Sequence, residues 1–247
     1  MLSFVLPDKH SDLAGVILGS GNLDGYKKDA TYFGVIIGHI ANRIAGARFT
    51  LDGHMYNLSD DDGNNTLNGG TKGLLDVIWD VVSYKSASHV AFGYNSRDGE
   101  EGFPGNVAVY VTYMLIGNDK LGVKMITKAI DKPTLVIMVL HMYWNLRGYG
   151  SGNIHHNIRL FTSKINPAQL IPTGEIEDVE GMAYDSHLWH PVGGRLKEIS
   201  TKDEAWSLME QSCGFSFGAE VVLSARRMRY EKYDLKYYSL PRRPEDI

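Results

Sequence analysis

The sequence VAVYVTYMLIGNDKLGVKMITKA, residues 107–129, decides the fold class of this chain. Its two apolar parts, 107–116 and 121–129, are rich in Val, Ile, Tyr and Thr, the residues that favour β-strands. The tripeptide Gly-Asn-Asp at 117–119 separates them, and glycine and asparagine tolerate the positive φ that a tight turn requires. The stretch therefore predicts an antiparallel hairpin of two long strands.

Segments of similar composition lie on both sides of this hairpin. We expect further strands at 77–84, 90–94 and 135–140, each bounded by turn-forming residues. A helical pattern is weak and confined to 200–209. Many short strands separated by turns predict an all-β fold, a large antiparallel β-sandwich, and we expect one domain over residues 1–247.

Composition excludes several classes of protein. Hydrophobic residues make up 43% and charged residues 22%, as in ordinary globular domains, and the net charge of -4 provides no basic field for nucleic acid. The single cysteine, Cys213, has no intrachain partner for a disulfide, so we expect a cytoplasmic location. The start of the chain lacks a signal-peptide pattern, and the longest apolar run, 135–140, is too short to cross a membrane.

The pentapeptide His-Met-Tyr-Trp-Asn at 141–145 is the strongest candidate for a functional site. The imidazole of His141 can transfer protons near neutral pH, the indole of Trp144 can stack on a sugar ring, and a carboxamide can pair with hydroxyl groups in both directions. A histidine beside aromatics on a strand is more often a structural core residue. The pentapeptide alone therefore leaves both interpretations open.

Four other motifs stand in a fixed order around this pentapeptide: GVIIGHIANRIAG at 34–46, GNNTLNGG at 63–70, DGEEGFPG at 98–105 and IPTG at 171–174. Together they resemble the aldose 1-epimerases, or galactose mutarotases, most closely the plant members, from about residue 6 to about residue 238. The resemblance implies a β-sandwich with its site in a cleft on one face, and a sugar or sugar-derived metabolite as the small-molecule ligand. It implies no cofactor.

The resemblance also implies residue roles. His141 matches the family's general acid, and Asn42 and Arg43 match a pair that binds sugar hydroxyls, for which an arginine fork is suited. Trp144 belongs to the same aromatic setting as His141. We expect Asn42, Arg43, Asn68, His141 and Trp144 to face one cleft.

Departures from the family pattern are as informative as the matches. Asn68 stands where the family has a second active-site histidine, and Ser216 where it has a sugar-binding aspartate. His39 replaces an arginine and is at best a weaker, titratable cation, and Leu140 replaces an amide before His141. These replacements suggest a degenerate and less polar active site.

The chain ends are a further departure. The segment with the family's catalytic glutamate is not matched, nor are its first strands, so we expect an open sheet edge that permits a homo-oligomer. The remaining acids near the end, such as Glu231 and Asp234, are not in a matching context.

Three functions remain open. The protein is a mutarotase-fold enzyme repurposed for isomerisation, cyclisation or elimination of a small metabolite with His141 as proton-transfer residue, or a non-catalytic carbohydrate or metabolite binder, or a weak aldose 1-epimerase. No metal site is expected, because His187 and His190 have no matching third ligand in evident reach.

Overall fold

The structure is a computed structural model that describes residues 3–8, 10–28, 31–117, 120–145 and 148. Further along the chain it describes residues 171 and 180 and short strand segments at 157–158, 164–165, 177–178, 190–191, 221–227 and 233–239. Among all of these described residues, no helix has the length and hydrophobicity needed to span a bilayer.

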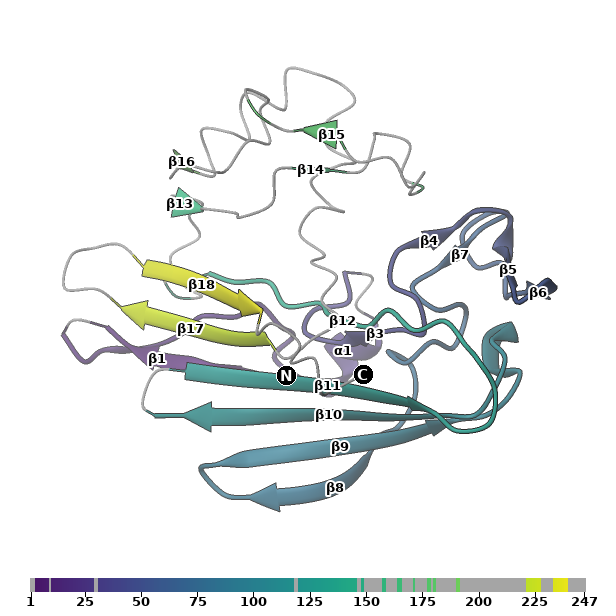
Figure 1. Cartoon of the computed structure of the whole chain (residues 1–247). Helices are drawn as coiled ribbons and strands as arrows, with labels where there is room; N and C mark the ends of the chain where they lie inside the picture. The colour runs from purple at the N-terminus through teal and green to yellow at the C-terminus, as the bar shows by residue number, and fades with distance from the viewer. Residues whose placement is uncertain are drawn as a thin grey trace.

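The main element is a six-stranded antiparallel sheet, which lies along the bottom of Figure 1. Its strand order is β18-β17-β11-β10-β9-β8. The strands are β8 (Asp80–Lys85), β9 (His89–Ser96), β10 (Val107–Ile116), β11 (Lys120–Ala129), β17 (Val221–Arg227) and β18 (Tyr233–Ser239).

The β10–β11 hairpin confirms the strongest sequence prediction. Val107 pairs with Ala129 and Ile116 with Lys120, which leaves residues 117–119 as the connection, and Gly117 has a φ of 64°. The strand expected at 90–94 extends to His89–Ser96 in β9. The strand expected at 77–84 begins only at Asp80, in β8.

A second layer of short strand pairs packs on one face of this sheet. β3 (Ile36–Ile37) pairs with β12 (Val139–Leu140), and β4 (Arg43–Ile44) pairs with β7 (Thr66–Leu67). The core lies between the layers: Val107, Val109 and Val111 of β10 pack with Leu74 and Met138 from the second layer. Burial of such side chains is the main stabilising contribution to the fold. The β-sandwich expected from the sequence is confirmed.

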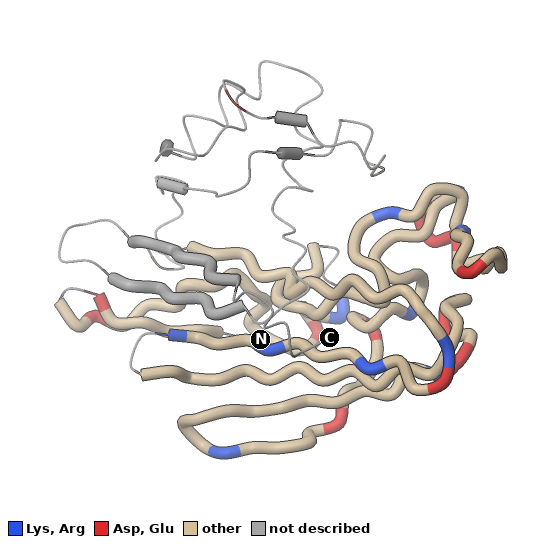
Figure 2. Tube along the Cα trace, viewed as in Figure 1, with Lys and Arg blue, Asp and Glu red and all other residues tan. Residues whose placement is uncertain are grey.

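The remaining short elements connect or flank these layers. They are β1 (Val5–Pro7) with β2 (Leu13–Gly15), β5 (Arg48–Leu51) with β6 (His54–Asn57), β13 (Asn157–Ile158) with β16 (His190–Pro191), and β14 (Lys164–Ile165) with β15 (Glu177–Asp178). Short 3₁₀ turns follow β4 and β9, at Ala45–Ala47 and Glu100–Gly102. Along the described chain, basic and acidic residues occur together, most densely at the right-hand side of the view in Figure 2.

One local expectation was wrong, and one short element was not predicted. The six-residue strand predicted at 135–140 contains only Val139 and Leu140 in ladder pairing, with an isolated bridge from Ile137 to Ile40. A helix that the sequence did not predict, α1 (Leu23–Lys27), is one turn long, and the side chain of Asn22 accepts a hydrogen bond from the Gly25 amide at 2.8 Å. The helix expected at 200–209 lies outside the described residues.

Candidate functional site

Two asparagines join the segments that carry the first candidate residues. The backbone amide of Asn42 donates to the side-chain oxygen Oδ1 of Asn68 at 3.0 Å. The backbone amide of Asn68 donates to the backbone carbonyl of Asn42 at 3.1 Å. Both have positive φ, 70° and 54°, which asparagine tolerates better than most residues. The Arg43 amide in turn donates to Oδ1 of Asn42 at 2.8 Å. The side-chain oxygens of both asparagines therefore accept hydrogen bonds from backbone amides. Their side-chain nitrogens, Nδ2, are the groups able to donate to a ligand.

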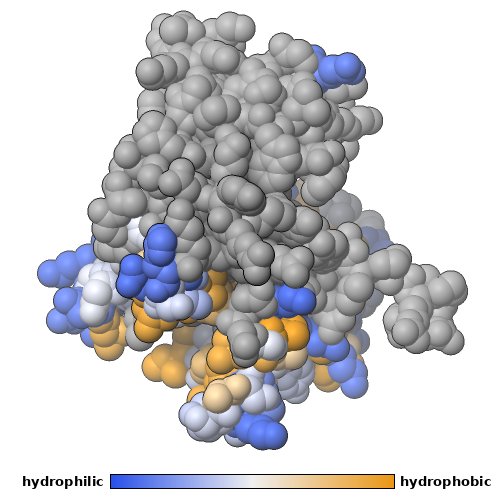
Figure 3. All heavy atoms as spheres, turned by 90° about the vertical axis from the view of Figure 1, so that its left-hand side faces the viewer, coloured by the Kyte–Doolittle hydropathy of each residue, from blue (hydrophilic) through white to orange (hydrophobic). Residues whose placement is uncertain are grey.

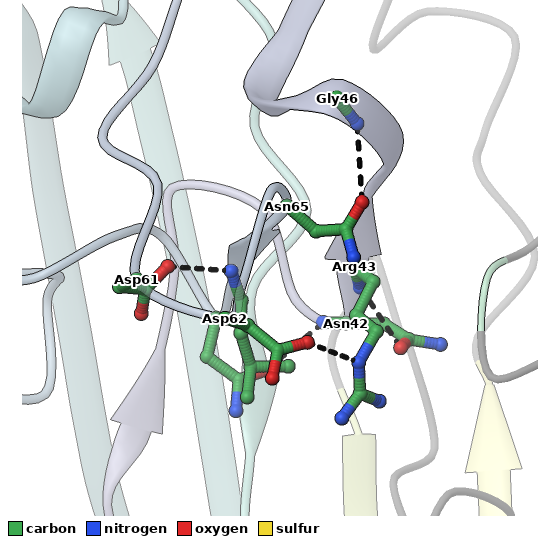
Figure 4. Close-up of polar contacts among 8 residues, drawn as sticks. Asn42, Arg43, Gly46, Asp61, Asp62 and Asn65 are labelled. Carbon is green, nitrogen blue, oxygen red and sulfur yellow. Dashed lines mark hydrogen bonds and ion pairs between the residues drawn. The ribbon is translucent and has the colours of Figure 1, made fainter.

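Arg43, at the start of β4, forms an ion pair with Asp62 in the loop before β7. Nε of Arg43 donates to Oδ2 of Asp62 at 2.6 Å, and both side chains are partly buried (Figure 4). Among the described contacts, the Asp62 carboxylate accepts from Nε of Arg43, and the two terminal nitrogens of the guanidinium are further donors that a ligand can use. This geometry fixes the direction of the arginine and suits a ligand with several oxygen acceptors.

Glycine is required beside this asparagine pair. A Cβ on Gly69 would lie 2.0 Å from the Gly38 carbonyl oxygen, and Gly69 has a φ of 99°. On Gly53, at the β5–β6 turn, φ is 78°, but a Cβ would have no atom within 4 Å. The close approach of backbone, rather than φ alone, therefore selects glycine at Gly69.

Gly69→Ala should destabilise the protein by about 1–3 kcal/mol more than Gly53→Ala, because only the first forces a steric overlap. Urea denaturation of both variants measures the difference. Equal losses of unfolding free energy would show that the contact between the Gly69 turn and Gly38 is not tight.

His141 lies at the end of the β3–β12 ladder. Its backbone amide donates to the Val35 carbonyl at 2.9 Å and its carbonyl accepts from the Gly34 amide at 2.7 Å. Nδ1 of the half-buried ring lies 3.0 Å from the Tyr32 carbonyl oxygen. A carbonyl oxygen can only accept, so Nδ1 carries the proton of this hydrogen bond. In the neutral ring, Nε2 is then the atom that can accept a proton.

Tyr143 is the aromatic residue next to His141. The two rings meet edge to face with centroids 5.0 Å apart, and the Tyr143 hydroxyl lies 3.5 Å from Nε2 of His141. Phe33 also contacts Tyr143 edge to face, with ring centroids 5.0 Å apart. Sequence reasoning did not include Tyr143 among the site residues, although it lies within the same pentapeptide.

Trp144 has a different environment from His141. Its ring meets Phe4 edge to face at 6.3 Å and packs against Leu6 and Val16, and it forms an isolated bridge with Ile17. The described contacts of the indole are thus with the apolar core. Stacking of Trp144 on a sugar stays a prediction.

His39 is buried, and its burial disfavours the cationic form that the sequence interpretation allowed at this position. The ring is 2% exposed, stacks on Phe103 at 4.6 Å and lies with Nε2 2.8 Å from the Ser96 hydroxyl. Nδ1 has no hydrogen-bond partner among the described residues. Burial lowers the pKa of His39, although the neighbouring carboxylates of Glu100 and Glu101 act in the opposite direction.

This burial predicts a pH dependence of stability. Because the pKa of His39 is lower in the folded than in the unfolded chain, the unfolded chain binds the proton more readily. The stabilisation that comes from neutral His39 is full above the pKa of about 6.5 that the residue has in the unfolded chain. It is lost as pH falls below this value, by at most about 1.4 kcal/mol per pH unit. Urea denaturation at about pH 7.5 and about pH 5.5 should show a smaller loss for His39→Gln than for the wild type. Equal losses would contradict the assignment to His39.

The described contacts bring Asn42, Arg43 and Asn68 together directly. The segment that precedes Asn42 links these three residues to His141. Its residues 34–37 run beside residues 139–141, and the backbone amide of Ala41 donates to the Ile137 carbonyl at 2.9 Å. Ser216 lies outside the described residues. Among the described residues, no group of three His, Cys, Asp or Glu side chains is placed to hold a metal ion.

The antiparallel sandwich described above is of the galactose mutarotase type, to which its structural neighbours belong. The sequence profile described as Aldose 1-epimerase matches residues 1–235. The chain belongs to the aldose 1-epimerase family.

Individual relatives agree with this assignment. Galactose mutarotase of Bos taurus is 40% identical over 195 residues, which are 78% of this chain and 56% of that protein. Aldose 1-epimerase of Escherichia coli is 28% identical over 97% of this chain and 72% of its own length. The chain thus spans little more than half the length of the mammalian relative. The resemblance to plant members stays a prediction.

Solved structures support the fold. An aldose epimerase homologue from C. elegans has a TM-score of 0.73 and 26% identity, and covers 80% of this chain and 61% of its own. Galactose 1-epimerase from Lactobacillus acidophilus has a TM-score of 0.68 and 20% identity, over 90% of this chain and 64% of its own, which supports the fold alone.

Proposed function

We propose that this protein binds an aldose or a closely related sugar and interconverts its anomers at a low rate, with His141 as the proton-transfer residue. The observation that carries the proposal is the hydrogen bond from Nδ1 of His141 to the Tyr32 carbonyl. It fixes the ring orientation and assigns proton exchange with a ligand to Nε2.

The chemistry requires two proton transfers. On ring opening, the anomeric hydroxyl loses its proton to a base, the bond between C1 and the ring oxygen breaks, and the ring oxygen receives a proton from Nε2 of protonated His141. On closure, the ring oxygen attacks the other face of the carbonyl, Nε2 takes its proton back, and the protonated base returns its proton to the carbonyl oxygen, which becomes the anomeric hydroxyl again. The guanidinium of Arg43 and the side-chain amide nitrogen of Asn42 are suited to hold sugar hydroxyls through these steps.

One argument for a less polar ligand is weakened by the packing of Leu140. Its side chain packs against the cluster of Ile36, Val109 and Met138, so its apolar character serves the core. The replacement at Leu140 therefore does not by itself favour a repurposed reaction. This leaves anomer interconversion as the better supported function.

Asn68 favours a second candidate, binding or conversion of a sugar-derived metabolite without mutarotation. Its carbonyl oxygen is held by the Asn42 amide, and an amide cannot exchange a proton as a histidine can. Loss of one proton-transfer group costs roughly two to four decades of rate, which would bring turnover close to the spontaneous reaction.

Polarimetry separates the two candidates. Fresh α-D-galactose and α-D-glucose should reach equilibrium rotation faster with the protein than in buffer, in proportion to protein concentration. Binding of either sugar, detected by ligand-observed NMR, without any acceleration would overturn the catalytic proposal and support the second candidate.

A further inference from the structure

The strand β8 forms one of the two edges of the six-stranded sheet in the described residues. It pairs with β9 alone among the described strands, and it lies at the lower margin of the molecule in Figure 1. All six of its residues are exposed, including Val81 at 62%, Val82 at 57% and Tyr84 at 70%. Seen from the side, hydrophobic side chains are exposed on the lower part of the molecule (Figure 3). An edge strand with this composition is a surface that can pair with another strand.

A β-bulge determines which side chains of β8 share a face. Gly93, Ala91 and His89 lie on one face of the sheet because they alternate along β9. Their partners in β8, which are Asp80, Ser83 and Lys85, therefore lie on that face as well. Val81 and Tyr84 pair with Phe92 and Val90, on the opposite face. The extra residue, Val82, lies over Gly93, since a Cβ on Gly93 would be 2.7 Å from Cγ2 of Val82. Val82 is therefore on the same face as Asp80 and Lys85.

This arrangement makes β8 complementary to itself in antiparallel orientation. If a second β8 is placed beside the first about a twofold axis between Val82 and Ser83, Asp80 lies opposite Lys85 of the other copy. Val81 then lies opposite Tyr84, and the bulged Val82 opposite Ser83, the smallest side chain of the strand. In a regular strand, residues 80 and 85 would be on opposite faces and this register would fail, but the bulge places each pair on one face.

The proposed pairing agrees with the chemistry of each face. On one face, Asp80 of each copy lies opposite Lys85 of the other. On the other face, Val81 of each copy lies opposite Tyr84 of the other. Pairs of opposite charge and pairs of an aromatic with a β-branched side chain both stabilise neighbouring strands. Such a contact is isologous, as in most homodimers. We propose that two copies of this chain associate through β8 in this register and join their six-stranded sheets into one continuous antiparallel sheet.

Charge reversal tests the register. Sedimentation velocity of the full chain over a broad dilution series should show a dimer that dissociates on dilution. Asp80→Lys should weaken association by roughly tenfold or more, because two Lys-Lys contacts replace two ion pairs. Lys85→Asp should have the same effect, and the double variant Asp80→Lys/Lys85→Asp should restore association. Asp60→Lys, an exposed change of the same charge away from β8, is the matched control and should have no effect.

The side chains exchanged are exposed, so circular dichroism should show an unchanged fold in every variant. A wild type that remains monomeric at every concentration would overturn the proposal. So would a dimer that Asp80→Lys leaves intact, or a double variant that does not recover.

Discussion

Replacement of His141 by alanine is expected to slow the protein-dependent interconversion of anomers by at least about 100-fold, which makes it indistinguishable from the reaction in buffer. The physical reason is the fixed orientation of the ring. Nδ1 is held by the Tyr32 carbonyl, so Nε2 is the atom that can exchange a proton with a sugar oxygen. Polarimetry with fresh α-D-galactose, corrected for the rate in buffer, measures the loss.

His54→Ala is a close control for this variant. Nδ1 of His54 also lies near a backbone carbonyl, that of Asp52 at 3.1 Å, but the residue is exposed on the β5–β6 hairpin. Its removal should leave the rate unchanged. Glu231→Gln and Asp234→Asn should each change the rate by less than about tenfold. A folded His141→Ala protein with the wild-type rate would remove His141 from the mechanism, and a large loss from either acid variant would identify a carboxylate partner instead.

Phe103→Ala should cost about 3–5 kcal/mol of unfolding free energy, the largest expected effect on stability in the described residues. Phe103 is 0% exposed and belongs to a cluster with Ile40 and Leu58, and its ring stacks on His39 at 4.6 Å and on Phe49 at 6.0 Å. Alanine would leave a cavity and remove the stacking surface that supports His39.

Urea denaturation followed by fluorescence measures this effect. Met55→Ala, at an apolar residue that is 62% exposed on β6, should cost less than about 1 kcal/mol under the same conditions. A loss for Phe103→Ala no larger than for Met55→Ala would mean that the Phe103 cluster is not part of the cooperative core.

The sequence predicted those parts of the fold in which composition and geometry agree. In β10, β-branched and aromatic residues extend over a whole strand, and a turn with glycine follows, so this strand was predicted with the same boundaries. At 135–140 a similar apolar run mostly forms no ladder, because its residues contact the core and single backbone partners such as His39 and Ala41. α1 is a single turn and is too short for a periodic pattern.

Site residues show the same limit. The resemblance indicated Asn42, Arg43, Asn68 and His141, and the structure adds what each one contacts. Nothing in the sequence distinguished a buried His39 from an exposed one, because its burial depends on Phe103 and Ser96, which are distant in sequence. The packing of Trp144 on Phe4 depends in the same way on a long-range contact.

The central claim, that Nε2 of His141 exchanges protons with a bound sugar, is tested most directly by nitrogen NMR of the protein labelled at its histidine rings. His141, assigned by comparison with His141→Ala, should show a protonated Nδ1 and an unprotonated Nε2 in its neutral ring. Addition of galactose should shift the Nε2 resonance of His141 and leave that of His54 unchanged. A His141 ring with the proton on Nε2, or a ring whose resonances do not respond to saturating sugar, would contradict the account.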